Sequence, residues 1–511
     1  MSCVPFSWSL LEPALAWATL GLPAWPALRA CASGPFRRAF PRESALLGAM
    51  LAVYAATLTA ITVRAPVALR PLAVLAIGWL VVVHLHTRAS RGRARGWPPG
   101  RLRLLPLEPW FQRWFFLEQH RRYGSPFKVS QFIKPMVCVV GLRRGLDLYR
   151  AHEASLASPR LWFGRFIPGG LMRHMEPAKH EAYRDIFRHA FGREVFRPLE
   201  PFIAATMRTA LAHMAQDSAA SGGRGITPRT RLQRMMFVVW AKLFFDVEER
   251  SETFSRLKSL YHVIDIRHPH GVSGRRIRAA LAEISTLLER QLETSRAGAP
   301  EPASVLAALA HRHPEAVGDP GVIGNLIYEM HITWSDLSGF VQWLLRMLTD
   351  NPLWLERLRD ECTQTDERQG DEPSLAARIV AETLRMEQSE HLYRVAERTI
   401  EHEGMVIPRG WLVRLCVHES HRDPEVFEHP DVFNPDRFLG RVYTRNEYSP
   451  FGAGRHACLG EPLARTVGRI FVEEIARGWQ WHTVMDGPLE QSSWRHWRPS
   501  SLWRILLTAR P

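Results

Sequence analysis

Cysteine is scarce in this sequence, and its six cysteines form no Cys-x-x-Cys pair. Such wide spacing argues against a disulfide framework and against a zinc site built on cysteine pairs, and it fits a reducing compartment. A lone cysteine is most often a small buried hydrophobic side chain. We apply that interpretation to five of the six, whereas Cys458 stands apart because it lies among glycines.

The sequence also lacks an internal repeat, a recognised nucleic-acid-binding motif and any region that resembles a flavin or iron–sulfur reductase. Its formal net charge is +15 and its isoelectric point is about 10.1. A basic chain suits an acidic protein partner or an anionic membrane surface. Because lysine and arginine are spread along the whole chain, we expect no nucleic-acid partner.

Two long uncharged apolar runs stand near the N-terminus. Residues 44–63 (SALLGAMLAVYAATLTAITV) give 20 residues without a charge, which is enough for a helix to cross a bilayer core. Residues 71–86 give a second run of 16, which is shorter than an average span. The runs predict a membrane anchor of one or two helices. A buried core helix is the alternative for each run, and the second run could instead lie in the membrane interface.

Basic residues flank these runs on both sides. The arginines next to the runs are Arg29, Arg37, Arg38, Arg42, Arg88, Arg91, Arg93 and Arg95. Because Lys and Arg beside spans tend to stay in the cytoplasm, we expect the main body on the cytoplasmic side of the membrane. Arg64 and Arg70, between the two runs, weigh against a hairpin of two complete spans.

These features divide the chain into four segments. The predicted segments are an apolar interfacial segment (1–43), a transmembrane anchor (44–90), a basic proline-rich linker (91–107) and one large folded body (108–511). Tryptophans in the first segment favour the membrane interface. Pro98 and Pro99 give the linker an extended backbone.

The folded body is expected to be mainly α-helical with a minor β region. The predicted elements are a helix over 110–123 capped by Gly124, strands over 127–133 and 136–140, helices within 145–350, and a surface loop over 216–229. After residue 393 the chain becomes rich in proline and aspartate, which predicts a long irregular segment before helix resumes beyond Gly460. A long irregular segment in a folded body usually carries function.

Cys458 lies in that segment, in the loop YSPFGAGRHACLGEPLAR, just before a helical pattern. A thiolate that binds a haem iron needs an isolated cysteine on a rigid loop close to the porphyrin face. Backbone N–H groups and the positive end of the following helix must stabilise its charge. Glycines allow the tight turns and close approach that this requires. The loop therefore predicts a thiolate-ligated haem.

This loop resembles the haem-binding loop of the cytochrome P450 family. The family pattern F-x-x-G-x-[RH]-x-C-x-G is matched at Phe451, Gly454, His456, Cys458 and Gly460. The resemblance implies that Cys458 is the axial ligand to the iron of haem b, that Phe451 shields its sulfur, and that His456 reaches a haem propionate. Gly452 joins the other glycines in the close approach to the cofactor. The resemblance extends from about residue 97 to the C-terminus.

A charged network is implied by two further motifs. Glu382 and Arg385 form E-x-x-R, and residues three apart on a helix can pair. In the family this pair locks to an arginine downstream, here Arg437 in FNPDRF. The role would be structural, and a buried charged network is tolerated only when it is fully satisfied.

Three basic residues resemble the family's anchors for the haem propionates. His180 and Arg184 stand four apart in KHEAYRDIF and match H-x-x-x-R, while Arg394 follows the E-x-x-R motif. Residues four apart share one face of a helix. The alternative for each of the three is an ordinary surface charge.

The long central helix departs from the family pattern. It is predicted over 322–349, and counting back from the Asn-Pro pair that follows places residues 332–337 (ITWSDL) where the family has [AG]-G-x-[DE]-T-[TS]. Thr333 then replaces a glycine, Ser335 replaces the acid and Asp336 replaces the threonine of the family's proton relay. Either Asp336 and Ser335 deliver protons in inverted order, or oxygen activation is altered.

A one-residue shift of this alignment is a third interpretation, with Glu329, His331 and Thr333 as nearby polar groups. We expect the family's mainly α fold behind transmembrane helices, and hydroxylation of a lipophilic small molecule with O2. A separate ferredoxin or flavin reductase would supply the electrons. The alternatives are a haem-thiolate isomerase, dehydratase or peroxygenase that needs no reductase, and a non-catalytic haem protein in which Trp334 and Asp336 block the oxygen site.

Overall fold

The computed structural model describes residues 96–102, 109, 112–131, 134–264, 273–296, 304–363, 372–387, 392–492 and 496–510. The predicted interfacial segment 1–43 and the predicted anchor 44–90 lie outside the described residues. Within the described ranges, no helix is both long and apolar enough to cross a membrane. The chain divides into a sheet unit (Met1–Ser158 with Leu392–Glu419) and a helical unit (Pro159–His391 with Ser420–Pro511).

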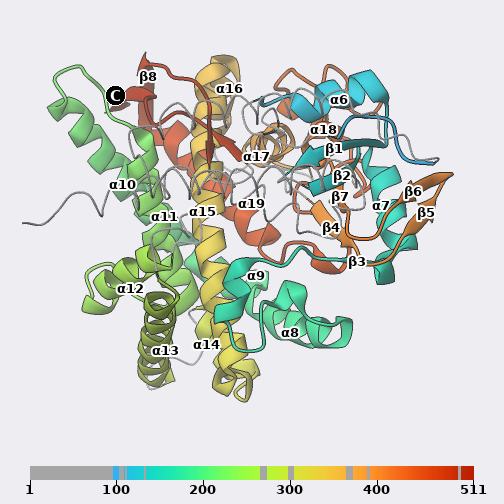
Figure 1. Ribbon diagram of the computed structural model, residues 1–511. Coiled ribbons are helices and arrows are strands. Elements are labelled where there is room, and N and C mark those ends of the chain that lie inside the picture. Colours follow the sequence, from blue (N-terminus) through green and yellow to red (C-terminus); the bar gives the residue numbers. More distant parts are fainter. Residues whose placement is uncertain are drawn as a thin grey trace, which may run out of the picture. The chain divides into compact units, whose positions relative to one another are not determined.

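The sheet unit is built on a five-stranded sheet (Figure 1). In spatial order its strands are β1 (Phe127–Gln131), β2 (Lys134–Val139), β7 (Leu412–Leu415), β4 (Leu392–Ala396) and β3 (Leu156–Ala157). β2 and β7 are parallel, and the other neighbours are antiparallel. Its other elements are α6 (Phe115–Tyr123), α7 (Leu142–Ala151), η3 (Glu153–Ser155), the hairpin of β5 (Ile400–His402) and β6 (Met405–Ile407), and α18 (Val417–Ser420) at its end.

The core of the sheet unit forms around β2, which is buried along nearly its whole length. A strand that is covered on both faces has a continuous apolar sequence, and residues 136–139 of β2 (MVCV) form such a run. Phe127 and Met136 pack there with Cys138, Leu412 and Cys416. Both cysteines are buried, so the prediction of small buried hydrophobic side chains is confirmed for these two.

The last part of the predicted linker packs along β1. The Lys128 backbone N–H donates to Pro99 O at 2.7 Å, and the rings of Trp97 and Trp411 meet edge to face at 4.7 Å. Gly100 has a φ of 119°, and a Cβ there would lie 2.2 Å from Lys128 O. Only glycine fits this close approach of two backbones.

The helical unit consists mostly of α-helices (Figure 1). They are α8 (Pro177–Ala190), α9 (Arg193–Phe196), α10 (Glu200–Ala220), α11 (Pro228–Phe245), α12 (Glu252–Val263), α13 (Gly274–Arg296), α14 (Val305–Arg312), α15 (Pro320–Asp350), α16 (Pro352–Thr363), α17 (Leu375–Met386) and α19 (Glu461–Gly478). Short 3-10 helices are η4 (Trp162–Phe166), η5 (Met172–His174), η6 (Arg197–Leu199), η7 (Ala316–Gly318), η8 (Pro435–Phe438) and η9 (Gly454–His456). Two small sheets pair β8 (Trp479–Met485) with β11 (Arg504–Ala509) and β9 (Glu490–Ser492) with β10 (His496–Arg498).

α15 runs through the middle of the helical unit, with α11 and α19 packed against it (Figure 1). It begins where the side chain of Asp319 accepts the N–H of Gly321 at 2.7 Å and Pro320 occupies the first turn. Its side chains are buried on nearly every side, as in a core helix. The predicted helix over 322–349 is confirmed and is slightly longer at both ends.

The predicted helix over 110–123 begins only at Phe115, and it ends as expected at Gly124. The predicted loop over 216–229 is too long, because α10 continues to Ala220 and α11 begins at Pro228. The reason is the side chain of Ser218, which is buried in the core and forms a hydrogen bond there. The buried hydroxyl of Ser218 accepts the N–H of Leu507 at 2.8 Å, so this part of the polar stretch is held as helix.

The irregular segment predicted after residue 393 is partly wrong, because 392–415 supplies four strands. β4 and β7 pair with each other, β7 also pairs with β2, and β4 also pairs with β3. β2 and β3 stand more than 200 residues earlier in the chain, so local composition cannot reveal these pairings. Mainly α structure with a minor β region is nevertheless what the described residues form.

A glycine in α19 generates a first prediction. A Cβ on Gly468 would lie 2.8 Å from Phe340 of α15 and 3.0 Å from Val380 of α17. We expect Gly468→Ala to lower the melting temperature, because an overpacking cost of roughly 1–3 kcal/mol outweighs a helix-propensity gain of about 1 kcal/mol. Gly478→Ala in the same helix meets open space and serves as the control. Equal melting temperatures for the two variants in thermal denaturation would contradict the close contact.

Candidate functional site

Cys458 lies between η9 and α19, and it is the exposed cysteine among those described. The loop around it is closed by its own backbone. The Cys458 N–H donates to Phe451 O at 2.9 Å, and the Ser449 hydroxyl donates to Gly452 O at 2.8 Å. An exposed thiol on such a closed loop can reach an iron, whereas the buried thiols of the chain cannot.

Two of the three predicted glycines are required by backbone conformation. Gly452 has a φ of 73° and Gly454 a φ of 68°, both in the left-handed region that favours glycine. Gly460 differs, because it takes an ordinary φ of −83° at the start of α19. A Cβ there would lie 3.7 Å from the Cys458 sulfur, which is normal van der Waals contact. Gly460 lies in a turn beside the thiol, and its predicted place at the cofactor stays a prediction.

Basic side chains from α8 gather beside the loop. The rings of His180 and His456 lie 4.6 Å apart between centroids, and His180 is buried. Burial lowers the pKa of Arg184, one turn further along α8, while the charges of Cys458 and Glu329 raise it. The structure thus brings together an exposed thiol, two imidazoles and a guanidinium. This set fits a haem, with the thiol for the iron and the basic groups for the propionates.

Arg394 and Phe451 take different positions. Arg394 belongs to the sheet unit, where it lies on β4 over the Tyr149 ring and donates to Tyr393 O at 2.8 Å. Its predicted contact with a propionate stays a prediction. Phe451 is half-buried next to the cysteine loop, with the Arg465 guanidinium 5.3 Å from its ring centre.

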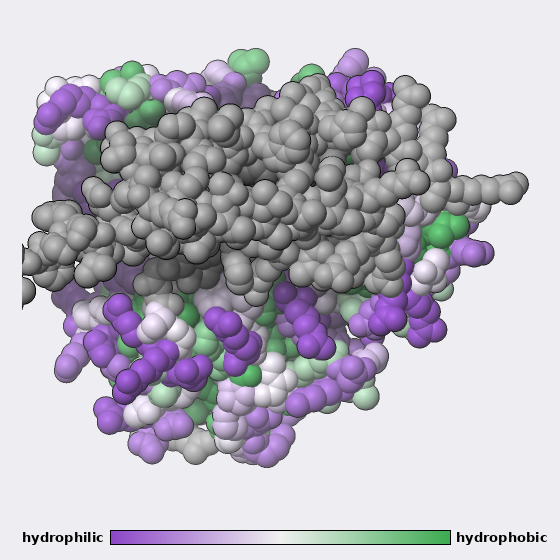
Figure 2. Space-filling model, viewed as in Figure 1, coloured by the Kyte–Doolittle hydropathy of each residue, from purple (hydrophilic) through white to green (hydrophobic). Residues whose placement is uncertain are grey.

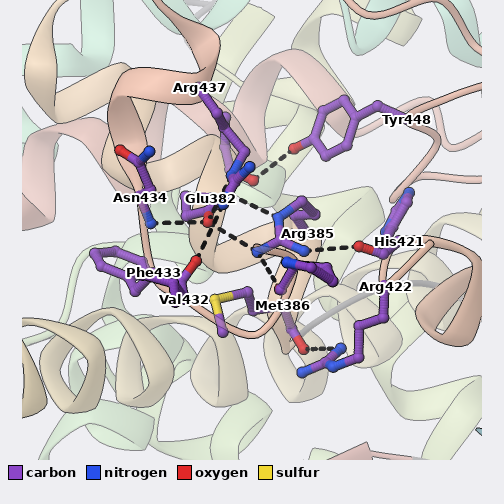
Figure 3. A network of polar contacts seen from close by, with 12 residues as sticks. Glu382, Arg385, Met386, His421, Arg422, Val432, Phe433, Asn434, Arg437 and Tyr448 are labelled. Carbon is purple, nitrogen blue, oxygen red and sulfur yellow. Dashed lines mark hydrogen bonds and ion pairs between the residues drawn. The ribbon is translucent and has the colours of Figure 1, made fainter. Parts of the chain in front are cut away.

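Glu382 is the centre of a buried charged network (Figure 3). One of its carboxylate oxygens accepts from Arg385 Nε at 2.7 Å. The other accepts from Arg385 Nη2 at 2.9 Å, from Arg437 Nε at 3.0 Å and from the Asn434 N–H at 2.9 Å. Glu382 and Arg385 are fully buried, and every oxygen of the carboxylate has a donor. The structure therefore brings the E-x-x-R motif and FNPDRF together.

The two arginines hold the irregular segment by its backbone carbonyls (Figure 3). Arg385 donates to His421 O at 2.7 Å and to Pro430 O at 2.8 Å. Arg437 donates to Glu428 O at 2.9 Å and to Val432 O at 3.1 Å. Residues 421–434 form neither helix nor strand and have no ladder to satisfy their carbonyls, so these bonds help to give them their shape.

His421 and Tyr448 connect this network to the cysteine loop, and sequence reasoning missed both contacts. The Ser449 N–H donates to His421 Nε2 at 3.0 Å, and the Tyr448 hydroxyl donates to Ala381 O of α17 at 2.8 Å. Burial, with the nearby charges of Arg385 and Arg422, lowers the pKa of His421 to about 3. The imidazole is therefore neutral and can accept a bond. No local pattern identifies such a histidine, because its partner lies 28 residues away.

The altered positions of α15 point in different directions. The Trp334 indole is buried, donates to Gln233 O at 2.9 Å and meets the Phe237 ring at 5.1 Å, so it faces α11. The Ser335 carbonyl accepts from Arg498 at 3.0 Å. Asp336 is half-exposed, and it acts electrostatically on Glu329, two turns earlier.

We expect Glu382→Gln to abolish stable folding or lower the melting temperature sharply. The change leaves two buried guanidinium groups without a counter-charge, which typically costs about 3–5 kcal/mol. Circular dichroism melting curves check this. The control is Glu283→Gln, which removes the same charge from an exposed pair with Arg256 and should leave the melting temperature near that of the unmodified chain. A Glu382→Gln protein as stable as this control would contradict the structural role.

Comparison with known proteins adds three findings. The family model described as Cytochrome P450 matches residues 338–501, a span that contains the charged network and Cys458 and begins two residues after Asp336. Abscisic acid 8'-hydroxylase 3 from Oryza sativa subsp. japonica is 24% identical over 422 residues, covering 76% of this chain and 82% of the relative. Abscisic acid 8'-hydroxylase 1 from Arabidopsis thaliana is 24% identical over 390 residues, covering 72% and 81%.

A solved structure shows the same fold. The retinoic acid bound cyanobacterial CYP120A1 superimposes with a TM-score of 0.67 at 18% identity, covering 82% of this chain and all of that chain. The fold, the matched family model and the curated relatives agree with the cysteine loop and its charged network. The chain is therefore similar in sequence and in fold to cytochrome P450 proteins, and the curated relatives named above are hydroxylases.

Proposed function

We propose that this protein hydroxylates a lipophilic small molecule, with haem b bound through the Cys458 thiolate and electrons from a separate donor. One observation carries the proposal. An exposed thiol stands at the head of α19, on a loop closed by its own backbone, beside His180, His456 and Arg184. Such a thiol with basic neighbours suits an iron and two carboxylates together.

Each residue of the site has a task in this proposal. A bound haem supplies the activation of O2 by two electrons. Cys458 is held as a thiolate by the positive end of α19 and by the charge of Arg184. His180 and His456 bind carboxylates from one side of the loop. Phe451, on the same loop, is the residue that would shield the sulfur once a haem is bound, which would preserve the thiolate's donor strength.

The relatives suggest where a substrate search should begin. Abscisic acid and retinoic acid, the compounds in the names of the relatives and the structural neighbour, are both acids on an apolar skeleton. We propose a substrate of this kind. Both compounds are suitable first probes in a spectral binding titration, in which a substrate that enters the site shifts the Soret band.

The electron donor and the membrane complete the proposal. A chain with a net charge of +15 suits an acidic donor, which would be a ferredoxin or a flavin reductase. The apolar runs at 44–63 and 71–86 would anchor the protein, with the catalytic domain on the cytoplasmic side.

A haem-thiolate isomerase, dehydratase or peroxygenase is the second candidate. The observation in its favour is the changed relay, since Ser335 and Asp336 stand at the positions of the family's acid and alcohol and the Ser335 carbonyl is taken by Arg498. Electron dependence separates the two candidates. A hydroxylase needs O2 and a reductase, whereas these enzymes turn over without one.

The absorption difference spectrum of dithionite-reduced protein, with and without CO, tests the proposed haem ligand. We expect a strongly red-shifted Soret band typical of thiolate ligation in the unmodified protein and its loss in Cys458→Ser. Cys362→Ser is the matched control, because this half-buried cysteine belongs to α16 and should leave the band intact. A haem-loaded protein without such a band would overturn the assignment of the ligand.

His180→Ala and His456→Ala test the propionate contacts. Each should speed the transfer of haem to an excess of apomyoglobin, by roughly tenfold for the loss of a charge-assisted hydrogen bond. Because the two rings are neighbours, the double variant should lose less than the sum of the single effects. His482→Ala, on the exposed part of β8, is the control. Equal transfer rates for all three variants would remove both histidines from the site.

A further inference from the structure

Two histidines from distant parts of the sequence lie side by side in the sheet unit. His152 follows the last residue of α7, and His402 is the last residue of β5. Nε2 of His152 and Nδ1 of His402 are 3.3 Å apart, and the two ring planes are inclined by 84°. We call these two residues the histidine pair. The proposed haem site makes no use of either side chain.

The distance between the two nitrogens fits a shared metal ion better than a hydrogen bond. Hydrogen bonds from N–H groups are most often about 2.9–3.0 Å long, so 3.3 Å is long for one. Zn²⁺ binds imidazole nitrogens at about 2.0–2.1 Å in a tetrahedron, which separates two such ligands by about 3.3–3.4 Å. Neighbouring ligands of a square-planar ion with bonds of about 2.0 Å are only about 2.8 Å apart. The observed separation therefore favours a tetrahedral ion.

The ring of His402 can adjust to such an ion. Its second nitrogen, Nε2, is shielded from solvent and has no hydrogen-bond partner among the described residues. No second bond therefore fixes the ring, and a small rotation can bring the lone pairs of both imidazoles onto one point. Both histidines are half-buried, so an ion can reach them from solvent.

The backbone around the histidine pair is well defined. His402 pairs with Met405 in the β5–β6 hairpin, and Glu403 and Gly404 between them have φ values of 48° and 71°. Positive φ at both positions is what the tightest hairpin turns require. His152 is the C-cap of α7, and the C-terminal end of a helix favours positive charge. A cation between the two imidazoles would therefore lie at the negative end of α7.

The histidine pair would supply two ligands, and water would supply the others. Within the described ranges, no group of three or more His, Cys, Asp or Glu side chains could hold a metal ion. The carboxylate of Glu403 is 3.8 Å from the Arg144 guanidinium, so we do not count it as a ligand. His402 lines a small cavity together with Leu148 and Met405, which gives room for water. Open coordination positions filled by water are normal for zinc outside purely structural sites.

We infer that the histidine pair binds Zn²⁺ and thereby fastens the end of α7 to the β5–β6 hairpin. The two ligands stand 250 residues apart in the sequence, so the bound ion cross-links distant parts of the sheet unit. An ion that binds only the folded chain stabilises it by mass action. The inference does not depend on the proposed hydroxylase function, because no residue of the cysteine loop or of the charged network takes part.

Isothermal titration calorimetry with Zn²⁺ on the haem-loaded full chain tests the inference. We expect His152→Ala and His402→Ala each to raise the dissociation constant of one Zn²⁺ by about a hundredfold or more. The loss of a group that merely orients a metal ligand already costs about 10- to 100-fold in affinity. His482→Ala, on the exposed part of β8, is the control and should leave binding unchanged. Unchanged Zn²⁺ affinity in both pair variants would overturn the inference.

Thermal denaturation separates a metal site from a simple hydrogen bond between the rings. Zn²⁺ should raise the melting temperature of the unmodified protein and of His482→Ala, whereas Mg²⁺ should not, because it prefers oxygen ligands. His152→Ala and His402→Ala should lose most of this rise. If they melt at a lower temperature without metal but keep the full rise with Zn²⁺, the histidine pair is a structural contact only and the inference is wrong.

A ligand exchange gives an answer even where an alanine variant does not fold. His152→Cys keeps a zinc ligand but replaces nitrogen by sulfur. Because Zn–S bonds are about 2.3 Å long and Zn–N bonds about 2.0–2.1 Å, X-ray absorption at the zinc edge should show a sulfur shell that the unmodified protein lacks. His482→Cys should show none. A zinc spectrum of His152→Cys without sulfur contradicts the site. The CO difference spectrum should stay the same in every variant, so a failure of the haem assignment is seen separately.

Discussion

The buried carboxylate of Glu382 is the interaction on which the order of the site depends. Three charged side chains are removed from water here, and each would cost several kcal/mol alone. The arrangement is tolerable because both carboxylate oxygens have donors and the spare N–H groups of Arg385 and Arg437 go to backbone carbonyls. Since those carbonyls belong to a segment without helix or strand, the network replaces the hydrogen-bond ladder that regular structure would supply.

Two contacts of different kinds connect the charged network around Glu382 to the cysteine loop. His421 offers its backbone carbonyl to Arg385 and its neutral ring to the Ser449 N–H, so one residue connects the network with the first turn of the loop. Tyr448 adds a bond to α17. A thiolate must be held at a fixed height and angle to act as an iron ligand, and these contacts leave the loop little freedom. The long irregular segment is thus rigid because it is bonded, not because it is regular.

The cysteine side of the site could be predicted from the sequence to a large extent, because its signals are local. Two glycines with positive φ, a cysteine and a helix start lie within ten residues. What could not be predicted depends on partners distant in the chain. The strands after residue 393, the ring of His421 and the turn of Trp334 toward α11 are all decided by such contacts. A family pattern does not say which of its glycines needs a positive φ, and the structure adds that Gly452 and Gly454 need one whereas Gly460 does not.

The cysteine loop and the polar positions of α15 also differ in how strictly their chemistry determines the sequence. An axial ligand has one allowed position, and the residues that hold it are bound by the same geometry, so the family match covers this side. Proton delivery demands less: a titratable group of suitable pKa within reach, connected by hydroxyls or carboxylates. Along a helix such a group can move by one or two turns and still lie on the same face. The sequence of α15 can therefore depart from the family pattern while the cysteine loop keeps it.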